Sequence, residues 1–155
     1  MDRRRFLQEA TAAGLTLTPL AALLAACGHS ALPDGMVEVK WGRDTCTRCS
    51  MALSDRRFAA QVRGGPNDAS FKFDDIGCVA VWLKAQPWGK DAATRIWVAD
   101  VSNHGDSVRW LEAKAAQYVG GKTSPMGYNF GAVAMAEAGA VDFDTMRQHV
   151  LAKGI

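Results

Sequence analysis

Two cysteines and a methionine lie within six residues of one another, at Cys46, Cys49 and Met51. Thiolate and thioether sulfurs are soft ligands, and together they favour soft metal ions, above all Cu(I). If this segment is extended, the side chains of Cys49 and Met51 leave the same face of the strand and can bind one ion. Cys46 is close enough in sequence either to bind the same ion or to form a disulfide with Cys49. Its role decides whether such a site is always open or is switched by oxidation.

Met126 is the main further candidate for a sulfur ligand. It lies in a Ser-Pro-Met-Gly sequence that indicates a turn, and such a turn would hold the thioether away from the core. His104, in an Asn-His-Gly loop, could also bind a metal, whereas Cys78 is interpreted as a buried, unreactive thiol on the inner face of a helix. Asp74 and Asp75 are adjacent carboxylates at the start of that helix, where capping accounts for both.

The first 26 residues are predicted to be an export signal. Arg-Arg-Arg-Phe-Leu at residues 3–7 matches the twin-arginine pattern, and a weakly apolar stretch at residues 10–26 follows it. Leu-Ala-Ala-Cys at residues 24–27 reads as a lipobox, so we expect cleavage before Cys27 and lipidation of its thiol. A short transmembrane anchor is the alternative, but the stretch is short and is interrupted by threonine, glycine and proline, which makes a poor spanning helix.

These features predict three regions, which are a signal peptide at residues 1–26, a lipidated tether at residues 27–35 and a folded domain at residues 36–155. The lipid would hold the protein at the periplasmic face of a bacterial membrane, and Gly28 favours the outer membrane. Because that compartment is oxidising, free thiols in the folded domain need a reason to persist. The domain has an odd number of cysteines, so at least one of them is unpaired.

Composition and the lack of other motifs exclude several functional classes. The net charge of +2 gives no basic excess for binding nucleic acid. The sequence has no second cysteine or histidine pair at zinc-finger spacing, no phosphate-binding glycine loop and no nucleophile elbow. We therefore expect a protein that is not an enzyme.

The pattern of apolar and turn residues predicts a compact α+β domain with mainly antiparallel strands. The order strand, strand, helix, strand occurs about twice. Among the apolar residues, five are interpreted as core residues: Trp41, Trp82, Trp97, Met135 and Met146. Strands are expected at residues 36–41, 58–62, 71–73, 95–100, 107–112 and 117–119, and helices at residues 76–84, 128–138 and 144–153.

Four sequence features together resemble the NosL family of copper-binding lipoproteins, which are associated with the assembly of nitrous oxide reductase. They are the lipobox at Cys27, the Cys-Ser-Met element at residues 49–51, the Phe-Lys-Phe-Asp-Asp-Ile-Gly-Cys segment at residues 71–78, and the Ser-Pro-Met-Gly turn with Phe130 and Gly131 after it. Each is short, but their order after a lipoprotein signal is specific.

The resemblance implies a fold of two similar ββαβ units and a copper chaperone that serves denitrification. Such a protein would hold Cu(I) outside the cytoplasm and deliver it to the copper centres of nitrous oxide reductase, with an ABC-type maturation complex as its docking partner. By the same resemblance, Cys49, Met51 and Met126 match the copper ligands of the family. Cys46 departs from the family pattern, which does not require a cysteine at this position. It could be a fourth ligand, half of a protective disulfide or a redox gate. The resemblance does not assign His104.

Two other functions stay open from the residues alone. Cys46 and Cys49 form a CxxC pair that a periplasmic thiol-disulfide protein could use, although redox pairs of the thioredoxin type begin a helix and the chain here is expected to be extended. A scaffold lipoprotein without metal could instead bind a partner through exposed tryptophans at Trp88 and Trp110.

Overall fold

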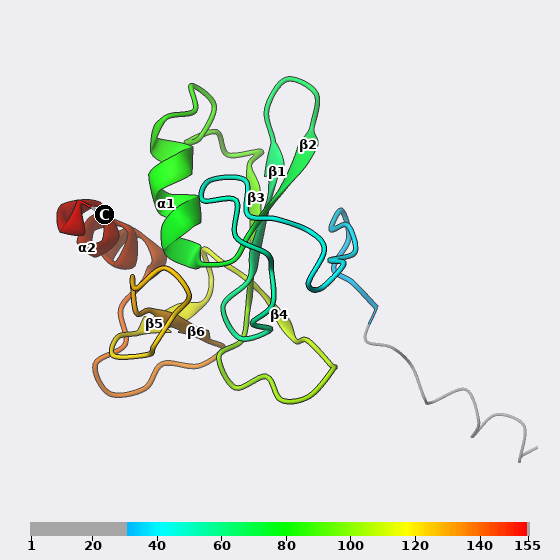
Figure 1. Ribbon diagram of the computed structural model, residues 1–155. Helices are drawn as coiled ribbons and strands as arrows, with labels where there is room; N and C mark the ends of the chain where they lie inside the picture. Colours follow the sequence, from blue (N-terminus) through cyan, green and yellow to red (C-terminus); the bar gives the residue numbers. More distant parts are fainter. Residues whose placement is uncertain (1–30, 155) are drawn as a thin grey trace, which may run out of the picture. The chain divides into compact units, whose positions relative to one another are not determined.

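A four-stranded antiparallel sheet with the strand order β2-β1-β3-β4 forms the centre of the fold (Figure 1). β1 (Ala60–Gly64) and β2 (Ala69–Phe73) form the predicted hairpin, with Ala60 opposite Phe73. β3 (Arg95–Ala99) pairs with the other side of β1, and β4 (Trp110–Glu112) is the outer strand beside β3. The computed structural model describes residues 31–154, so the predicted signal peptide and Cys27 lie outside the described residues.

The first helix, α1 (Ile76–Lys84), follows β2 directly and packs against both strands of the hairpin. Asp75 begins the helix, because its side chain accepts a hydrogen bond from the backbone N–H of Gly77 at 2.8 Å. This helix has the predicted bounds. Gly77 allows the ring of Tyr128 to lie against the first turn, since a β-carbon at Gly77 would be 2.1 Å from that ring.

The second half of the chain adds a two-stranded sheet and a second helix. β5 (Gln117–Val119) pairs antiparallel with β6 (Gly131–Val133). α2 (Phe143–Lys153) packs against α1 and β5, and Asp142 caps it by accepting from Thr145 N at 2.7 Å. The observed helices and antiparallel sheets confirm the predicted α+β class.

Two predicted elements are wrong. Residues 36–41 are not a strand, because the backbone of Val37 pairs with a side chain and the carbonyl of Lys40 accepts from Arg43 N and Asp44 N in a turn. Gln61 Oε1 accepts from Val37 N at 2.8 Å, and Gln61 Nε2 donates to Val37 O at 2.9 Å. Residues 128–138 are not a helix, since β6 occupies their middle and Asn129 has a φ of 65°. Within that segment Met135 is 81% exposed, so its predicted core position is also wrong.

The core lies between the main sheet, the two helices and β5. Its largest fully buried side chains include Tyr118, Tyr128, Phe73, Leu53 and Met146. Trp97 is buried, while the other four tryptophans are half-buried and pack against the core. In the part of the chain that the structure describes, neither helix has the length and apolar character needed to cross a membrane.

Candidate metal site

Three thiols and one carboxylate converge at the junction between β2 and α1. The ligand atoms of Cys46, Cys49, Asp74 and Cys78 all lie within 4.8 Å of one another, and we call these residues the thiol cluster. The two carboxylate oxygens of Asp74 are 3.4 and 3.5 Å from Cys49 Sγ. Three members of the cluster are buried, whereas Cys49 is half-buried. Solvent therefore reaches the cluster at Cys49.

A tight turn carries Cys46 and Cys49. Cys46 N donates to Met51 O at 2.8 Å, and Ser50 N donates to Cys46 O at 2.9 Å. Ser50 has a φ of 64°, a left-handed conformation that interrupts any strand-like alternation between its neighbours. The expected extended conformation of this segment is therefore wrong. Met51 follows the turn and is 46% exposed, and its role as a ligand beside Cys49 stays a prediction.

The turn is fastened to β2. Thr47 N donates to Lys72 O at 2.8 Å, and the ammonium group of Lys72 forms an ion pair with Asp44 and donates to Glu38 O. Asp44 also accepts from Lys40 N at 2.8 Å. Because β2 leads directly into Asp74, these bonds bring Cys46 and Cys49 beside the start of α1.

The remaining two members of the cluster come from the beginning of α1, and the sequence interpretation missed both. Capping accounts for Asp75 but not for Asp74, whose carboxylate faces the thiols. Cys78 is buried as predicted, yet it is not an isolated core thiol, because its sulfur belongs to the cluster. Asp74 precedes the N-cap Asp75 and is not part of the helix, so no helical spacing in the sequence pairs it with Cys78.

Burial and hydrogen bonds within the cluster shift the pKa values of its members in opposite directions. A hydrogen bond with Cys78 lowers the pKa of Cys46 to about 4, and the same bond raises the pKa of Cys78. Burial raises the pKa of Cys49 to about 11 and that of Asp74 to about 6. The cluster thus behaves as one coupled group in which a thiolate at Cys46 is stabilised by its neighbours.

Arg48 supplies a positive charge at the edge of the cluster. Its Nη1 lies 3.9 Å from Cys78 Sγ, and its guanidinium lies over the ring of Tyr128, 5.9 Å from the centroid. A guanidinium at this position favours negative charge on the sulfurs. It therefore suits a site that has to carry thiolates.

Met126 lies in a turn that is hydrogen-bonded to Asp75, the residue after Asp74. Gly127 N donates to Ser124 O at 3.0 Å, which closes the predicted turn, and Met126 N donates to Asp75 Oδ2 at 3.2 Å. The Met126 side chain is half-buried. His104 is exposed in the loop between β3 and β4 and is not a member of the cluster.

The donor set determines which ions fit. Three thiolates are soft ligands that suit Cu(I), and they also suit Zn²⁺, which accepts a carboxylate as a fourth ligand. All three described cysteines are free thiols, so each sulfur is available as a donor. The cluster can therefore bind a soft or borderline metal ion, and its residues were assembled from two separate segments of the chain.

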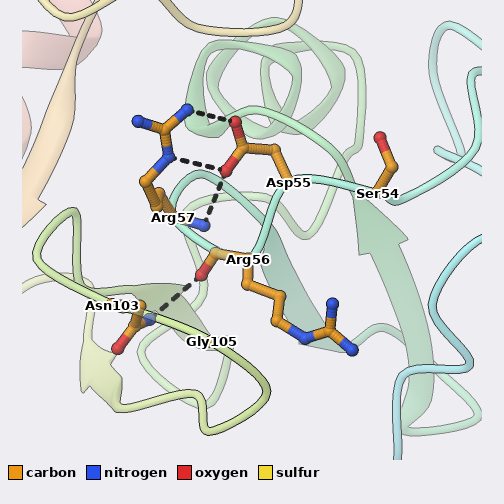
Figure 2. Close-up of a pocket in the computed structure, with 6 residues that line it drawn as sticks. All are labelled: Ser54, Asp55, Arg56, Arg57, Asn103 and Gly105. Atoms are coloured by element: carbon orange, nitrogen blue, oxygen red, sulfur yellow. Dashed lines mark hydrogen bonds and ion pairs between the residues drawn. The ribbon is translucent and has the colours of Figure 1, made fainter.

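A separate polar hollow of about 370 Å³ opens beside the segment that follows Met51 (Figure 2). Arg57 points at Asp55 and donates to its two oxygens at 3.0 and 2.7 Å, and Asn103 donates to Arg56 O at 3.0 Å. A neighbouring hollow shares Asp55 and Arg57 and reaches Ser124 and Pro125. Open surface therefore flanks the Met126 turn, but none of the lining residues belongs to the thiol cluster.

Comparison with family sequence models identifies a known family. The sequence model of the NosL family matches residues 39–148, a range that includes the thiol cluster and the Met126 turn. No curated protein sequence matches the chain.

Proposed function

Because the chain belongs to the NosL family of copper-binding accessory proteins, we propose that it is a copper chaperone which holds Cu(I) at the thiol cluster and passes it on to an acceptor protein. The observation that carries this proposal is the convergence of three cysteine sulfurs and one carboxylate within 4.8 Å. Two sulfurs would come from the predicted CxxC segment, and the third comes from α1.

The chemistry of the cluster supports Cu(I) as the cargo. Cu(I) is satisfied by few ligands, and soft sulfur donors select it over hard ions. Burial of Cys46 and Cys78 excludes water from one side of the site. In this proposal Cys46 is a ligand, which is one of the three roles that the sequence left open.

The half-buried position of Cys49 supports transfer by ligand exchange. An acceptor can approach the cluster at Cys49, and the exposed thioether of Met51 follows Cys49 by two residues. A sulfur ligand from the acceptor can then bind before the last donor of the chaperone leaves, so the ion is never released into water. Met51 and Met126 serve this exchange as additional ligands on the open side.

The partners and the location in this proposal rest on the sequence. The resemblance names nitrous oxide reductase as the acceptor and an ABC-type complex as the maturation partner. The predicted lipidation of Cys27 would hold the protein at the periplasmic face of a membrane, where the acceptor would be matured. Trp88 and Trp110, which a scaffold would use to bind its partner, are half-buried and pack against the core, and this favours the copper function over that alternative.

A competition titration tests the proposal. The reduced protein is titrated with Cu(I) against a chromophoric chelator, and Zn²⁺ is titrated separately. We expect one Cu(I) per chain, bound much more tightly than Zn²⁺, and weaker binding by at least about tenfold in Cys49→Ser and Cys78→Ser. Met135→Leu is a matched control for Met51→Leu, because Met135 is exposed and outside the cluster. Weak Cu(I) binding that is indifferent to the cysteines would refute the proposal.

The thiol-disulfide function is tested with the same variants. Cys46 and Cys49 are close enough to be oxidised together, since their sulfurs are within 4.8 Å. If oxidation leaves the Cu(I) affinity unchanged, a disulfide between them is not an off switch. If the protein instead exchanges disulfides with a model peptide and binds no Cu(I), the redox function is the correct one.

A further inference from the structure

The carboxylate of Asp75 is fully buried and bonds to two distant parts of the chain. One oxygen, Oδ1, accepts from Gly77 N at 2.8 Å and caps α1. The other, Oδ2, accepts from Ser124 Oγ at 2.6 Å and from Met126 N at 3.2 Å. Capping needs only one oxygen. The second oxygen therefore has a different role, which is to hold the turn that contains Met126.

Further hydrogen bonds close the turn that Asp75 holds. Ser124 Oγ also accepts from Asn129 N at 2.9 Å, and Asn129 Oδ1 accepts from Ser124 N at 3.4 Å. Gly127 supplies the left-handed conformation that the turn requires, with a φ of 73°. Because the Met126 amide is bonded to Asp75, the point from which the Met126 side chain leaves the backbone is fixed relative to α1.

Asp74 and Asp75 are adjacent, but their carboxylates face different parts of the protein. The Asp74 carboxylate lies among the thiols, whereas the Asp75 carboxylate faces the Met126 turn. The amide of Met126 is thus hydrogen-bonded to Asp75, which directly follows Asp74 of the thiol cluster. Both oxygens of Asp75 accept hydrogen bonds, and Asp75 is not a member of the thiol cluster.

We propose that Asp75 is a positioning residue that sets the Met126 thioether against the thiol cluster, so that Met126 can bind the Cu(I) held there. This inference rests on the proposed copper-binding function. It assigns to the second carboxylate of the Asp-Asp pair a role in the metal site, exerted through the turn and not through contact with the ion.

Asp75→Asn separates this role from helix capping. Asparagine is an equally good N-cap, so Oδ1 can still accept from Gly77 N. Its amide nitrogen, however, replaces the oxygen that accepts from Met126 N, and two donors then face each other. Asp142→Asn is the control for capping alone, because exposed Asp142 caps α2 by accepting from Thr145 N and lies outside the thiol cluster.

The experiment is a double-mutant cycle on Cu(I) affinity, measured by chelator competition on the full chain with reduced thiols. We expect Asp75→Asn and Met126→Leu each to weaken binding by about tenfold, the size typical of residues that orient a ligand. In the double variant the loss should not exceed that of Met126→Leu alone. Asp142→Asn should leave the affinity unchanged. X-ray absorption should count one sulfur fewer around copper in Asp75→Asn.

Two results would overturn the inference. One is an Asp75→Asn protein with wild-type affinity and sulfur count. The other is a loss that multiplies with that of Met126→Leu, since Asp75 would then act independently of Met126. If Asp75→Asn does not fold, Ser124→Ala replaces it in the cycle with the same expectations, because it removes one bond to Asp75 and leaves the cap intact. Failure of the wild-type protein to bind Cu(I) would refute the proposed function itself, which distinguishes the two cases.

Discussion

Replacing Gly77 by alanine sets helix propensity against packing, and the structure predicts which effect is larger. Within a helix, alanine is more stable than glycine by about 1 kcal/mol. At Gly77, however, the added β-carbon would lie 2.1 Å from Cγ and Cδ2 of Tyr128. Carbon atoms in contact prefer a separation of about 3.5–4.0 Å, so the ring would have to move by roughly 1.5 Å.

Tyr128 has little freedom to move that far. Its side chain is fully buried, Arg48 lies over its ring, and its carbonyl accepts from Lys153 Nζ at 2.7 Å. Forcing extra volume into a packed core costs about 1–3 kcal/mol, and the depth of this clash places Gly77→Ala at the upper end. After the gain in propensity is subtracted, we expect the free energy of unfolding to fall by about 2 kcal/mol.

Urea denaturation followed by far-UV circular dichroism measures this change. Ala80→Gly in the same helix is the control for propensity; because Ala80 is buried, it should lower the free energy of unfolding by about 1 kcal/mol for propensity and by about 0.8 kcal/mol more for the lost methyl group. In a Tyr128→Ala background, which removes Cγ and Cδ2 and leaves only the β-carbon at 2.7 Å, Gly77→Ala should be less harmful. A Gly77→Ala protein more stable than the wild type by about 1 kcal/mol would refute the reasoning, because propensity alone would then account for the result.

Three further predictions concern the turn and the thiol cluster. Ser50→Gly should raise the free energy of unfolding by about 0.5 kcal/mol in urea denaturation, since relief of the left-handed strain exceeds the added flexibility of the unfolded chain, whereas an unchanged or lower value would contradict the strain. Cys78→Ser should weaken Cu(I) binding in a chelator competition while His104→Ala leaves it unchanged, and equal effects would contradict the assignment of the cluster. Because the pKa of Cys46 is lowered to about 4 in the folded state, the metal-free protein should lose stability as the pH falls from 9 to 6. Below pH 6 Asp74, whose raised pKa is about 6, takes up a proton in the folded state and offsets further loss. Denaturation of Cys46→Ser across this range should show a flatter pH dependence, and the same slope as in the wild type would count against a Cys46 thiolate.

Local signals were sufficient to predict α1 and the hairpin. Asp75 is a strong capping residue, and the apolar residues after it recur at helical spacing, so the helix could be placed within the bounds that the structure has. The turn residues between β1 and β2 located the hairpin. Each of these elements depends on neighbours that are close in sequence, which is why the sequence alone was informative.

The two wrong elements depend on distant residues. Residues 36–41 alternate like a strand, but the buried side chain of Gln61 takes the hydrogen bonds of Val37 that a strand would use. Residues 128–138 are rich in alanine, yet pairing with β5 overrides their helix propensity. At Gly131 the backbone also approaches Val101 so closely that a β-carbon would lie 2.6 Å from its side chain. Neither constraint is visible within the segment itself.

The candidate site was predicted in part for the same reason. Cys46 and Cys49 stand out by their spacing, whereas Cys78 joins them only because the hydrogen bond from Thr47 to Lys72 carries their turn to the start of α1. Asp74 looked like one of two equivalent capping residues until the structure assigned the cap to Asp75. The methionine ligands remain predictions that the copper titrations can test.

The hydrogen bond between Thr47 and Lys72 has a consequence for the lifetime of the protein. An unfolded chain does not bring Cys46, Cys49 and Cys78 together, so an ion held by all three binds the folded chain preferentially and adds its binding energy to the stability. Loaded protein should therefore open less often and resist proteases longer than empty protein, and limited proteolysis with and without Cu(I) can measure the difference. The supply of copper would then determine both how much copper is bound and how much of the protein escapes proteolysis.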